Sequence, residues 1–566
     1  MRVTFLLLLS LWLIFPLQAQ QDLPQDYFAS PLEIPLILSG TFAELRSNHF
    51  HSGLDIKTHQ KTGLNVHASA EGYISRIKIS RFGYGKALYI QHPNGYTTVY
   101  AHLKKFSPTI QAYIKKVQYA KEDYEVEVFP KANELAVQQN ELIAFSGNSG
   151  GSGGPHLHFE IRDASARPMN ALNFGFDIQD SSPPLIQGVF VYPQGENSHV
   201  NSNNNRQKLR VIPQGDGTYV TEDFNAYGTI GFGVSTVDRL DFAPNKNGVY
   251  QIKTSVNGNE LMQVDFKKFS FSESRYINRF IDYAYYKNKR KRVQKLFQEE
   301  NNPLSIITTY GEKGLVHVKD SLDYNYVIKV RDFKGNTSTI KIPITSKEVA
   351  LDGILPKKID TTAYYAKASQ AVAFDEDGFD IYIPKNALYE DMYLDIKKDG
   401  EGIQVHYEEV PLHKNMTIGF DVSKYTPKDR EQLYVARMTS WGAAYYVNTY
   451  KKNNRFSVST KTFGKYALKQ DSAGPVITPV NFRENRWMSN EQELVFKIED
   501  KLTNIGDYRA TINGKFILME YDYKTDKLVY YFEDDIIQES ENNLKLIVLD
   551  NVGNSTTFEG TFFRKN

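Results

Sequence analysis

The sequence predicts a mainly β protein, in which an N-terminal antiparallel β-sheet domain is followed by about three β-sandwich domains of immunoglobulin-like type. The chain of 566 residues contains 37 Tyr and 34 Phe, and aromatic residues are enriched in β-strands. Runs that alternate between apolar and polar residues, such as Phe379–Ile383, recur between turns rich in Gly, Asn and Asp. This is the pattern of strands joined by hairpins. At roughly 100–200 residues per domain, the length allows three or four domains.

Charge and cysteine content exclude several classes of protein. The chain has 67 Lys and Arg against 66 Asp and Glu, so a formal charge of +1 gives no electrostatic reason to expect a nucleic-acid partner. The absence of cysteine excludes a disulfide scaffold, a thiolate metal site and a cysteine nucleophile. A hydrophobic content of 41% is too high for a disordered chain.

Residues 1–20 have the layout of a secretory signal peptide. Arg2 precedes an apolar run from Val3 to Phe15, and Ala19 supplies a small residue for cleavage. An uncleaved membrane anchor would look similar, but the run is shorter than the ~20 residues that span a bilayer. No later segment is long and apolar enough to span one. We therefore predict an exported protein of the periplasm, the cell envelope or the extracellular medium, without a transmembrane segment after signal cleavage.

The predicted N-terminal domain covers residues 32–178. Strand-like runs such as Tyr73–Ile79 and Ala87–Ile90 alternate with Gly turns, and a polar, helix-like insertion at about 105–135 interrupts them. Short strands joined by tight turns favour antiparallel pairing.

Residues 180–346 and 471–566 look like two copies of one unit. Asp180 and Asp471 begin similar Pro-containing linkers, and similar Asp-Gly-Asn turns follow Asp332 and Asp550 near the far ends. We predict an immunoglobulin-like β-sandwich for each, the first with a helical and basic insertion that includes the run at 287–292. This basic run is more typical of a solvated helix face than of a site for anionic polymers or lipid.

Residues 350–470, between these two units, form another β-rich stretch. Phe379–Ile383 alternates cleanly, and Phe463–Leu468 has the composition of a closing strand. We predict a β-sandwich of uncertain type.

Histidines carry the chemical signal of the sequence, since most of them lie between positions 49 and 158. His156 and His158 share one face of a predicted strand, after a Gly-rich loop, while Leu157 faces the other side. His51 and Asp55 are an even number of residues apart, so an extended chain can direct both to one point. A lone histidine is usually a satisfied polar residue, but this combination fits a catalytic zinc site with three N or O ligands and one open position.

The motifs that carry a family resemblance are His51-x-x-x-Asp55, the run Val99–Leu103 with its central His102, and the run Gly154–Ile161. Through them, residues 39–163 resemble the lysostaphin-type (LytM-type) zinc endopeptidases, which cut peptide bridges in bacterial peptidoglycan. The insertion after Leu103, and Gln139-Asn140 where a Gly is common, depart from the family pattern and affect the expected shape of the substrate groove.

This resemblance implies one Zn²⁺ per chain, bound by His51, Asp55 and His158. His102 and His156 would be the two catalytic histidines that do not bind the metal. The implied reaction is metal-assisted hydrolysis, with His156 as general base and His102 bound to the oxyanion or orienting the water, although these two roles could be exchanged.

Three further residues near these motifs have open roles. Glu160 shares the face of His156 and His158, and a supporting role is the simplest interpretation. Arg46 and Asn48 could contact substrate or zinc.

The resemblance predicts an exported zinc metalloendopeptidase that hydrolyses crosslinks or stem peptides of bacterial peptidoglycan. A non-catalytic peptidoglycan-binding scaffold or an amidase activator of the same fold is the alternative, and an adhesion or envelope-structural protein is a third. Retention of every ligand position favours the enzyme. The β-sandwich domains could contact the wall or an envelope protein partner. Asp332 and Asp550 could bind calcium, but turn formation also explains them.

Overall fold

The computed structural model describes residues 23–319, 322–534 and 536–565. The predicted signal peptide at residues 1–20 lies outside them. The described chain is mainly β, with an N-terminal β-sheet domain followed by several β-sheet units, which confirms the predicted fold class. The helices of the described ranges are all too short or too polar to cross a membrane.

The N-terminal domain is built on an antiparallel sheet in the order β1-β2-β11-β6-β5-β4-β8, with β12 beside β11 and β9 beside β4. These strands are β1 (Leu38–Gly40), β2 (Leu54–Lys57), β4 (Gly72–Ile79), β5 (Lys86–Gln91), β6 (Thr97–Ala101), β8 (Val126–Val128), β9 (Ala136–Val137), β11 (His156–Arg162) and β12 (Pro168–Met169). Strand β11 lies between β2 and β6, and its register sets His158 opposite both Asp55 and Ala101.

Burial explains this register. Leu157, Phe159 and Ile161 of β11 are fully buried on the core side of the sheet, so the alternation of a strand sends His156, His158 and Glu160 to the other face. A slip by one residue would exchange the two sets.

The remaining elements of this domain cover the sheet. A smaller sheet pairs β3 (Asn65–His67), β10 (Leu142–Phe145) and β7 (Lys105–Phe106). The polar insertion contains helix α1 (Pro108–Lys121), which has Pro at its first position and buries Ile110, Ile114 and Gln118 on one stripe. The short helix η1 (Ala171–Phe174) ends the domain.

The second unit contains a large sheet in which the long strands β13 and β17 pair along most of their length. Its strands are β13 (Leu185–Val200), β14 (Gln207–Leu209), β15 (Val211–Gly215), β16 (Thr218–Thr221), β17 (Phe224–Val237), β18 (Gln251–Val256), β19 (Asn259–Asp265), β20 (Gln294–Lys295), β21 (Ile307–Thr309), β22 (Val316–Val318), β23 (Asp323–Arg331) and β24 (Thr337–Ser346). Its helices are η2 (Ser274–Tyr276), α2 (Ile277–Phe280) and α3 (Tyr283–Lys289).

The apolar core of the second unit continues into the N-terminal domain. The ring of Phe269 lies 5.2 Å from that of Phe42 and 5.4 Å from that of Phe50, measured between centroids. The two parts therefore pack against each other through a shared apolar core.

The third unit has two five-stranded sheets and one short strand pair around a core of its own. Helix η3 (Leu351–Gly353) precedes it, and its elements are β25 (Tyr364–Ala366), β26 (Val372–Glu376), β27 (Phe379–Ile383), β28 (Met392–Leu394), β29 (Ile396–Asp399), β30 (Gly402–Val405), β31 (Pro411–Asp421), α4 (Pro427–Gln432), β32 (Leu433–Met438), β33 (Ala444–Val447), β34 (Thr449–Lys452), β35 (Arg455–Thr462) and β36 (Gly464–Gln470).

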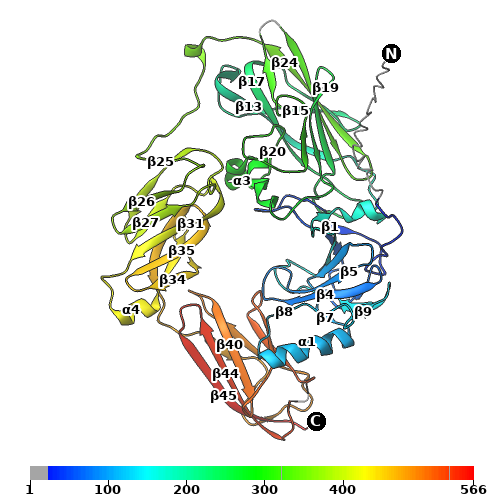
Figure 1. Ribbon diagram of the computed structural model, residues 1–566, viewed down its shortest axis with the longest axis vertical. Helices are drawn as coiled ribbons and strands as arrows, with labels where there is room; N and C mark the ends of the chain where they lie inside the picture. The colour runs from blue at the N-terminus through cyan, green and yellow to red at the C-terminus, as the bar shows by residue number, and fades with distance from the viewer. Residues whose placement is uncertain (1–22, 320–321, 535, 566) are drawn as a thin grey trace, which may run out of the picture.

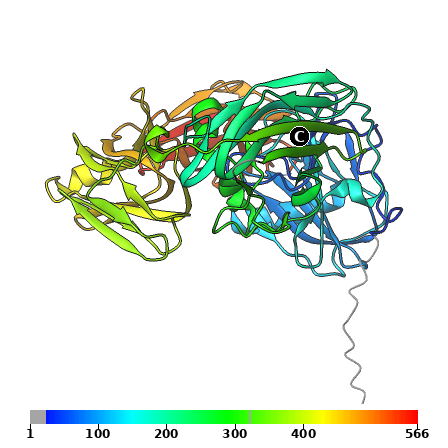
Figure 2. The same ribbon diagram turned by 90° about the horizontal axis from the view of Figure 1, so that it is seen from above.

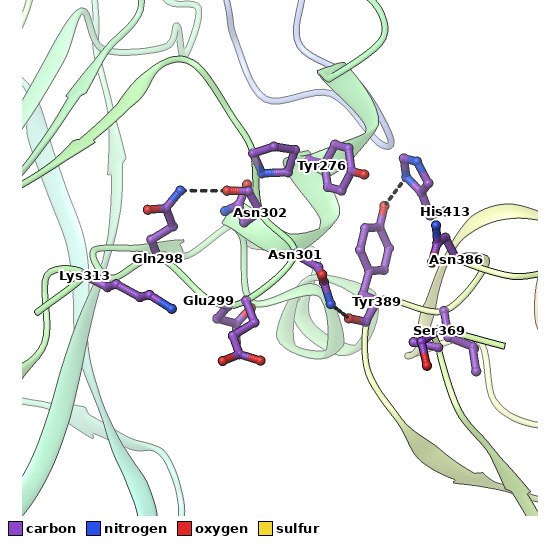
Figure 3. Close-up of a pocket in the computed structure, with 14 residues that line it drawn as sticks. Tyr276, Gln298, Glu299, Asn301, Asn302, Lys313, Ser369, Asn386, Tyr389 and His413 are labelled. Carbon is purple, nitrogen blue, oxygen red and sulfur yellow. Dashed lines mark hydrogen bonds between the residues drawn. The ribbon is translucent and has the colours of Figure 1, made fainter.

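A polar pocket lies where the second and third units meet (Figure 3). Tyr389 is its central contact, since its hydroxyl donates to the carbonyl of Arg275 at 3.0 Å and its own carbonyl accepts from Asn301 Nδ2 at 3.0 Å. His413 Nδ1 lies 3.4 Å from the same hydroxyl. The basic run of the second unit contributes an ion pair between Lys287 and Glu408 at 2.9 Å.

The C-terminal unit also has two sheets, in the orders β37-β39-β43-β42 and β38-β45-β44-β40-β41, around its own core. The strands are β37 (Val476–Pro479), β38 (Arg486–Trp487), β39 (Glu493–Glu499), β40 (Ile505–Ile512), β41 (Lys515–Phe516), β42 (Met519–Asp522), β43 (Lys527–Tyr531), β44 (Glu541–Asp550) and β45 (Ser555–Phe563).

The four parts follow one another around a closed path, so that the C-terminal unit packs against the N-terminal domain (Figure 1). Lys86 Nζ binds Glu520 at 2.8 Å, and the Arg81 guanidinium donates to the carbonyl of Gly506 at 3.2 Å. Figure 2 shows the third unit on the side of the molecule remote from the N-terminal domain. The last part of the chain thus meets the first.

Candidate metal centre

The three predicted metal ligands converge on one point, and we call them the His51 cluster (His51, Asp55 and His158). His51 Nε2 lies 3.0 Å from Asp55 Oδ1 and 3.1 Å from His158 Nδ1, and the last two atoms are 2.9 Å apart. All three side chains are buried. Ligand atoms bound to one zinc ion at 2.0–2.2 Å lie roughly 3.3 Å apart in a tetrahedral site, so this spacing fits a small cation.

Hydrogen bonds outside the cluster fix which nitrogen of each histidine faces inward. His51 Nδ1 lies 2.8 Å from the carbonyl oxygen of Thr41, and His158 Nε2 lies 2.8 Å from Glu160 Oε1. Each partner is an acceptor, so each outer nitrogen carries a proton and the inner nitrogen is the one that can bind a metal. Burial opposes a charge on His158, but its hydrogen bonds to Asp55 and Glu160 outweigh burial and raise its pKa to about 9, so a metal ion would displace a proton from its inner nitrogen. Neutral imidazoles with inward lone pairs are what a metal ion requires.

Glu160 is fully buried and held by three other side chains. It accepts hydrogen bonds from Ser52 Oγ at 2.8 Å, from Arg162 Nε at 2.6 Å and from the Tyr84 hydroxyl. Burial opposes its ionisation, but the charges of Arg162 and His158 outweigh burial and lower the pKa of Glu160. An ionised Glu160 therefore supports His158 from behind, as the sequence interpretation proposed.

Asp55 offers one oxygen to the cluster and one to Arg46. Its Oδ2 lies 3.1 Å from Arg46 Nη2, and the same nitrogen lies 3.0 Å from Glu44 Oε2. Burial would raise the pKa of Asp55, but the histidines around it, His51 first, lower it well below its usual range. Arg46 thus leaves Oδ1 free for a single bond to a metal.

His102 and His156 lie beside the cluster with their rings 4.8 Å apart. His156 Nδ1 lies 2.8 Å from the carbonyl oxygen of Gly154, and His102 Nδ1 lies 2.9 Å from that of Ser149. His156 Nε2 faces the cluster, 3.4 Å from Asp55 Oδ1. Both rings therefore hold the proton on Nδ1 and present Nε2 as an acceptor.

The backbone at His102 is in an unusual conformation. Its φ of 59° is left-handed, which costs free energy for a residue with a side chain. Burial first, then the neighbouring His158 and His156, lower the pKa of His102 to about 3. His102 is therefore neutral near pH 7.

Carbonyl oxygens of the Gly-rich loop at residues 146–155 accept hydrogen bonds from His102 and His156, and the C-terminal unit contacts this loop. Lys524 Nζ donates to the carbonyls of Asn148 and, at 3.2 Å, of Ser152. The Tyr523 hydroxyl donates to the carbonyl of Gly150 at 3.4 Å. A unit more than 350 residues away along the chain therefore contacts the segment that positions the histidines.

The remaining candidates lie elsewhere. Asn48 Oδ1 accepts from Asn278 Nδ2 of the second unit at 3.4 Å. His59 is exposed, while His92 is buried between the carbonyl of Glu71 and Thr98 Oγ1.

Sequence reasoning missed several residues that support the site. Ser52 lies directly after His51, and Tyr84 lies within the Gly83-Tyr-Gly85 motif, so a local signal existed for both. Thr41 supports His51 through its backbone carbonyl, and because every residue has one, the residue type gives no sequence signal. Lys524 has no signal at all, because its role depends on packing between distant units.

Two family models match parts of the chain. The model for peptidase family M23 matches residues 49–120, a segment that contains His51, Asp55 and His102. The model for the Zu5-like domain matches residues 363–471, which supplies a type for the β-rich stretch that the sequence left untyped.

Curated relatives match through the N-terminal domain. DD-carboxypeptidase/endopeptidase Mpg of Neisseria meningitidis serogroup B is 35% identical over 129 residues, which make up 23% of this chain and 24% of that protein. Peptidoglycan DD-endopeptidase ShyA of Vibrio cholerae is 28% identical over 146 residues, 26% of this chain and 28% of that protein. The chain thus spans about a quarter of the length of these relatives.

Among solved structures, the catalytic domain of the antimicrobial peptidase lysostaphin from Staphylococcus simulans covers 26% of this chain and 90% of its own, with 22% identity and a TM-score of 0.18. A zinc-containing peptidase from Vibrio cholerae covers 26% of this chain and 39% of its own, with 22% identity and a TM-score of 0.19. The family model and the curated relatives both match the N-terminal domain, which thus contains a segment similar to peptidase family M23 around His51, Asp55 and His102.

Proposed function

We propose that this protein is an exported zinc metalloendopeptidase that hydrolyses peptide crosslinks or stem peptides of bacterial peptidoglycan. The observation that carries the proposal is the His51 cluster. Its three ligand atoms lie within 3.1 Å of one another, and the outer nitrogen of each imidazole donates a hydrogen bond to an acceptor. Such a set supports metal binding, since three ligand atoms held this close are at nearly the spacing of ligands around one zinc ion.

The donor set favours zinc over other cations. Two imidazoles and one carboxylate suit Zn²⁺, whereas an all-oxygen set would suit Mg²⁺ or Ca²⁺. His51, Asp55 and His158 would hold the ion. When bound, zinc supplies Lewis-acid chemistry, because it acidifies water and polarises a peptide carbonyl.

His156 would act as the general base. Its Nδ1 proton is held by the carbonyl of Gly154, so Nε2 accepts a proton on the side that faces the cluster. The hydrogen bond to Gly154 also favours the imidazolium that forms, which would return the proton to the leaving amine.

His102 would orient the attacking water. Because its Nδ1 donates to Ser149 and its pKa is lowered to about 3, its Nε2 is a hydrogen-bond acceptor near pH 7. A neutral ring in this tautomer cannot donate from Nε2 to an oxyanion, so orientation of water is the better supported of the two roles considered for it.

The substrate class is inferred from the relatives. One is named a DD-carboxypeptidase/endopeptidase and another a peptidoglycan DD-endopeptidase. These relatives match this chain only through the N-terminal domain, and the bond that we propose it cuts is inferred from their names. Export rests on the signal-like N-terminus, and the β-sandwich units would contact the wall or an envelope partner.

Mass spectrometry of muropeptides, after incubation with the zinc-loaded full chain, tests the proposal. We expect one zinc per chain and new peptide ends, both lost in His158→Ala, while His156→Ala keeps zinc and loses cleavage. A protein that binds sacculi without zinc or cleavage would contradict the proposal and favour the non-catalytic scaffold.

A further inference from the structure

The second and C-terminal units each gather three aspartates at the same place in the fold. We call them the Asp180 cluster (Asp180, Asp238 and Asp332) and the Asp471 cluster (Asp471, Asp500 and Asp550). In each, one carboxylate oxygen per residue lies within 4.8 Å of the others. The first aspartate begins the linker into the unit, the second follows β17 or β39, and the third precedes the turn after β23 or ends β44.

The third aspartate has the same role in both clusters. Asp332 accepts hydrogen bonds from the backbone nitrogens of Gly335 and Asn336 at 2.7 and 2.9 Å, and from Asn336 Nδ2 at 2.8 Å. Asp550 accepts from Gly553 and Asn554 in the same way. Turn formation, which the sequence suggested, therefore accounts for this residue in both units.

The clusters differ in how the other two carboxylates are satisfied. In the Asp471 cluster, Thr503 Oγ1 donates to Asp471 Oδ2 at 3.0 Å. Asp500 Oδ1 accepts from three consecutive backbone nitrogens, those of residues 502–504, at 2.7 to 3.0 Å. Both carboxylates are thus compensated by donors.

The Asp180 cluster has less of this compensation. Asp180 Oδ1 accepts from the backbone nitrogen of Ser182 at 3.2 Å, as Asp471 Oδ1 does from that of Ala473. Asp241 stands where Thr503 does, in Asp238-Arg-Leu-Asp241 against Asp500-Lys-Leu-Thr503, so the hydroxyl donor of the C-terminal unit is replaced by a carboxylate, which accepts from Ser181. Asp180 Oδ2 and Asp238 Oδ1 are buried without a hydrogen-bond partner. Across the described ranges, no Lys or Arg forms an ion pair with any member of the cluster.

A neutral buried side chain beside the cluster also lacks partners. Asn247 pairs with Asp238 through two backbone hydrogen bonds of an antiparallel bridge, at 2.9 and 2.8 Å. Residues opposite each other in such a pair project to the same face. Asn247 is 2% exposed, and neither its Oδ1 nor its Nδ2 has a partner. The backbone pairing thus places the buried Asn247 side chain on the same face as that of Asp238.

Buried carboxylates without partners carry a large desolvation penalty. Asp238 is 3% and Asp332 1% exposed. Burial first, then the charges of Asp180 and Asp332, raise the pKa of Asp238 to about 8. Either protons or a cation must offset this charge in the folded protein.

We propose that Asp180, Asp238 and Asp332, with the amide oxygen of Asn247, bind a Ca²⁺ ion, and that the Asp471 cluster does not. An all-oxygen set of carboxylates and an amide is typical of a hard divalent cation and contains no imidazole for zinc. Calcium accepts many protein oxygens in flexible geometry, whereas Mg²⁺ demands an octahedron and keeps several waters. The site lies on the linker between the M23 domain and the second unit, so the ion would fix that junction.

Calcium titration of the full chain tests the inference without reference to peptidase activity. The protein is stripped of metal, reloaded with one equivalent of zinc, and titrated with CaCl₂ by calorimetry and thermal unfolding. We expect one calcium ion per chain and a higher Tm. No binding, or an equal response to MgCl₂, would overturn the calcium assignment.

Two variants localise the site, and one serves as control. Asp238→Asn should weaken calcium binding by roughly tenfold or more, since ligand charge sets affinity, and should unfold at higher temperature than the parent chain without calcium. Asp241→Thr copies the C-terminal unit and should also weaken binding, which keeps the test valid if the first variant does not fold. Asp500→Asn should bind calcium like the parent. Unchanged binding in both Asp238→Asn and Asp241→Thr would reject the site.

Discussion

The His51 cluster and the Asp180 cluster both bring three potential ligand atoms together, but they are supported differently. Around the His51 cluster, each outward atom has a partner: the carbonyl of Thr41 for His51, Glu160 for His158 and Arg46 for Asp55. In the Asp180 cluster, two buried carboxylate oxygens, Asp180 Oδ2 and Asp238 Oδ1, have no partner. The partners of the His51 cluster orient its imidazole nitrogens inward, which suits a metal that accepts nitrogen ligands. The Asp180 cluster instead gathers negative charge, which a hard cation would neutralise.

The largest effect should come from His158→Ala, which removes a ligand of the His51 cluster. Zinc binding and muropeptide cleavage should both be lost, while calcium binding at the Asp180 cluster stays as in the parent. Metal analysis and calorimetry measure the two ions separately. If the variant retained one zinc per chain, the ligand assignment would be wrong.

His156→Ala should separate metal binding from catalysis. The side chain is not among the three converging side chains, so zinc content should be unchanged, while kcat should fall about 10²–10⁴-fold because the proposed general base is lost. Steady-state kinetics on a purified crosslinked muropeptide provide the measurement. An equal loss of zinc would show that His156 is a ligand.

Glu160→Gln tests whether the outer support of the His51 cluster matters. An amide accepts the His158 proton less strongly than a carboxylate, so zinc affinity should fall about 10–100-fold. Competition with a zinc chelator measures this affinity. Glu134→Gln, an exposed position remote from the cluster, is the matched control and should leave it unchanged.

The Asp180 cluster should make the stability of the calcium-free protein depend on pH. The folded pKa of Asp238 is raised to about 8 from an ordinary value of 3.8, so the folded state binds more protons than the unfolded chain between these values. Stability should therefore decrease as pH rises through this window. Thermal unfolding of Asp238→Asn and the parent at several pH values, in chelator, isolates this contribution. Parallel curves would contradict it.

Lys524→Ala should have the smallest effect. It removes hydrogen bonds to the carbonyls of Asn148 and Ser152, so the loop that holds His102 and His156 should become more mobile. We expect a kcat lower by a few fold with zinc affinity unchanged. Lys545→Ala, an exposed lysine of the same unit paired with Glu559, is the control.

Local patterns in the sequence explain which features could be predicted. The alternation in β11 revealed that His156, His158 and Glu160 share a face, because the side-chain period of a strand is two. Asp55 joined them because its strand pairs with β11. The mainly β fold class followed from composition and turns.

Features that depend on distant pairing had no such signal. The members of the Asp180 cluster come from positions 180, 238 and 332, and only tertiary packing shows that Asp238 Oδ1 lacks a donor while Asp500 Oδ1 has three. The turn role of Asp332 was visible, but the partners of its cluster were not. The contact of Lys524 with the Gly-rich loop was hidden for the same reason.

The closed path of the chain has a consequence for its response to proteolysis. The connector around residues 347–362 is largely exposed and contains little regular structure, so it is accessible to a protease. A single cut there would leave two fragments that still touch through the Lys86–Glu520 ion pair and the clamp of Lys524 on the loop. The fragments should therefore stay associated on a sizing column, and a nicked molecule should keep the arrangement of His102 and His156.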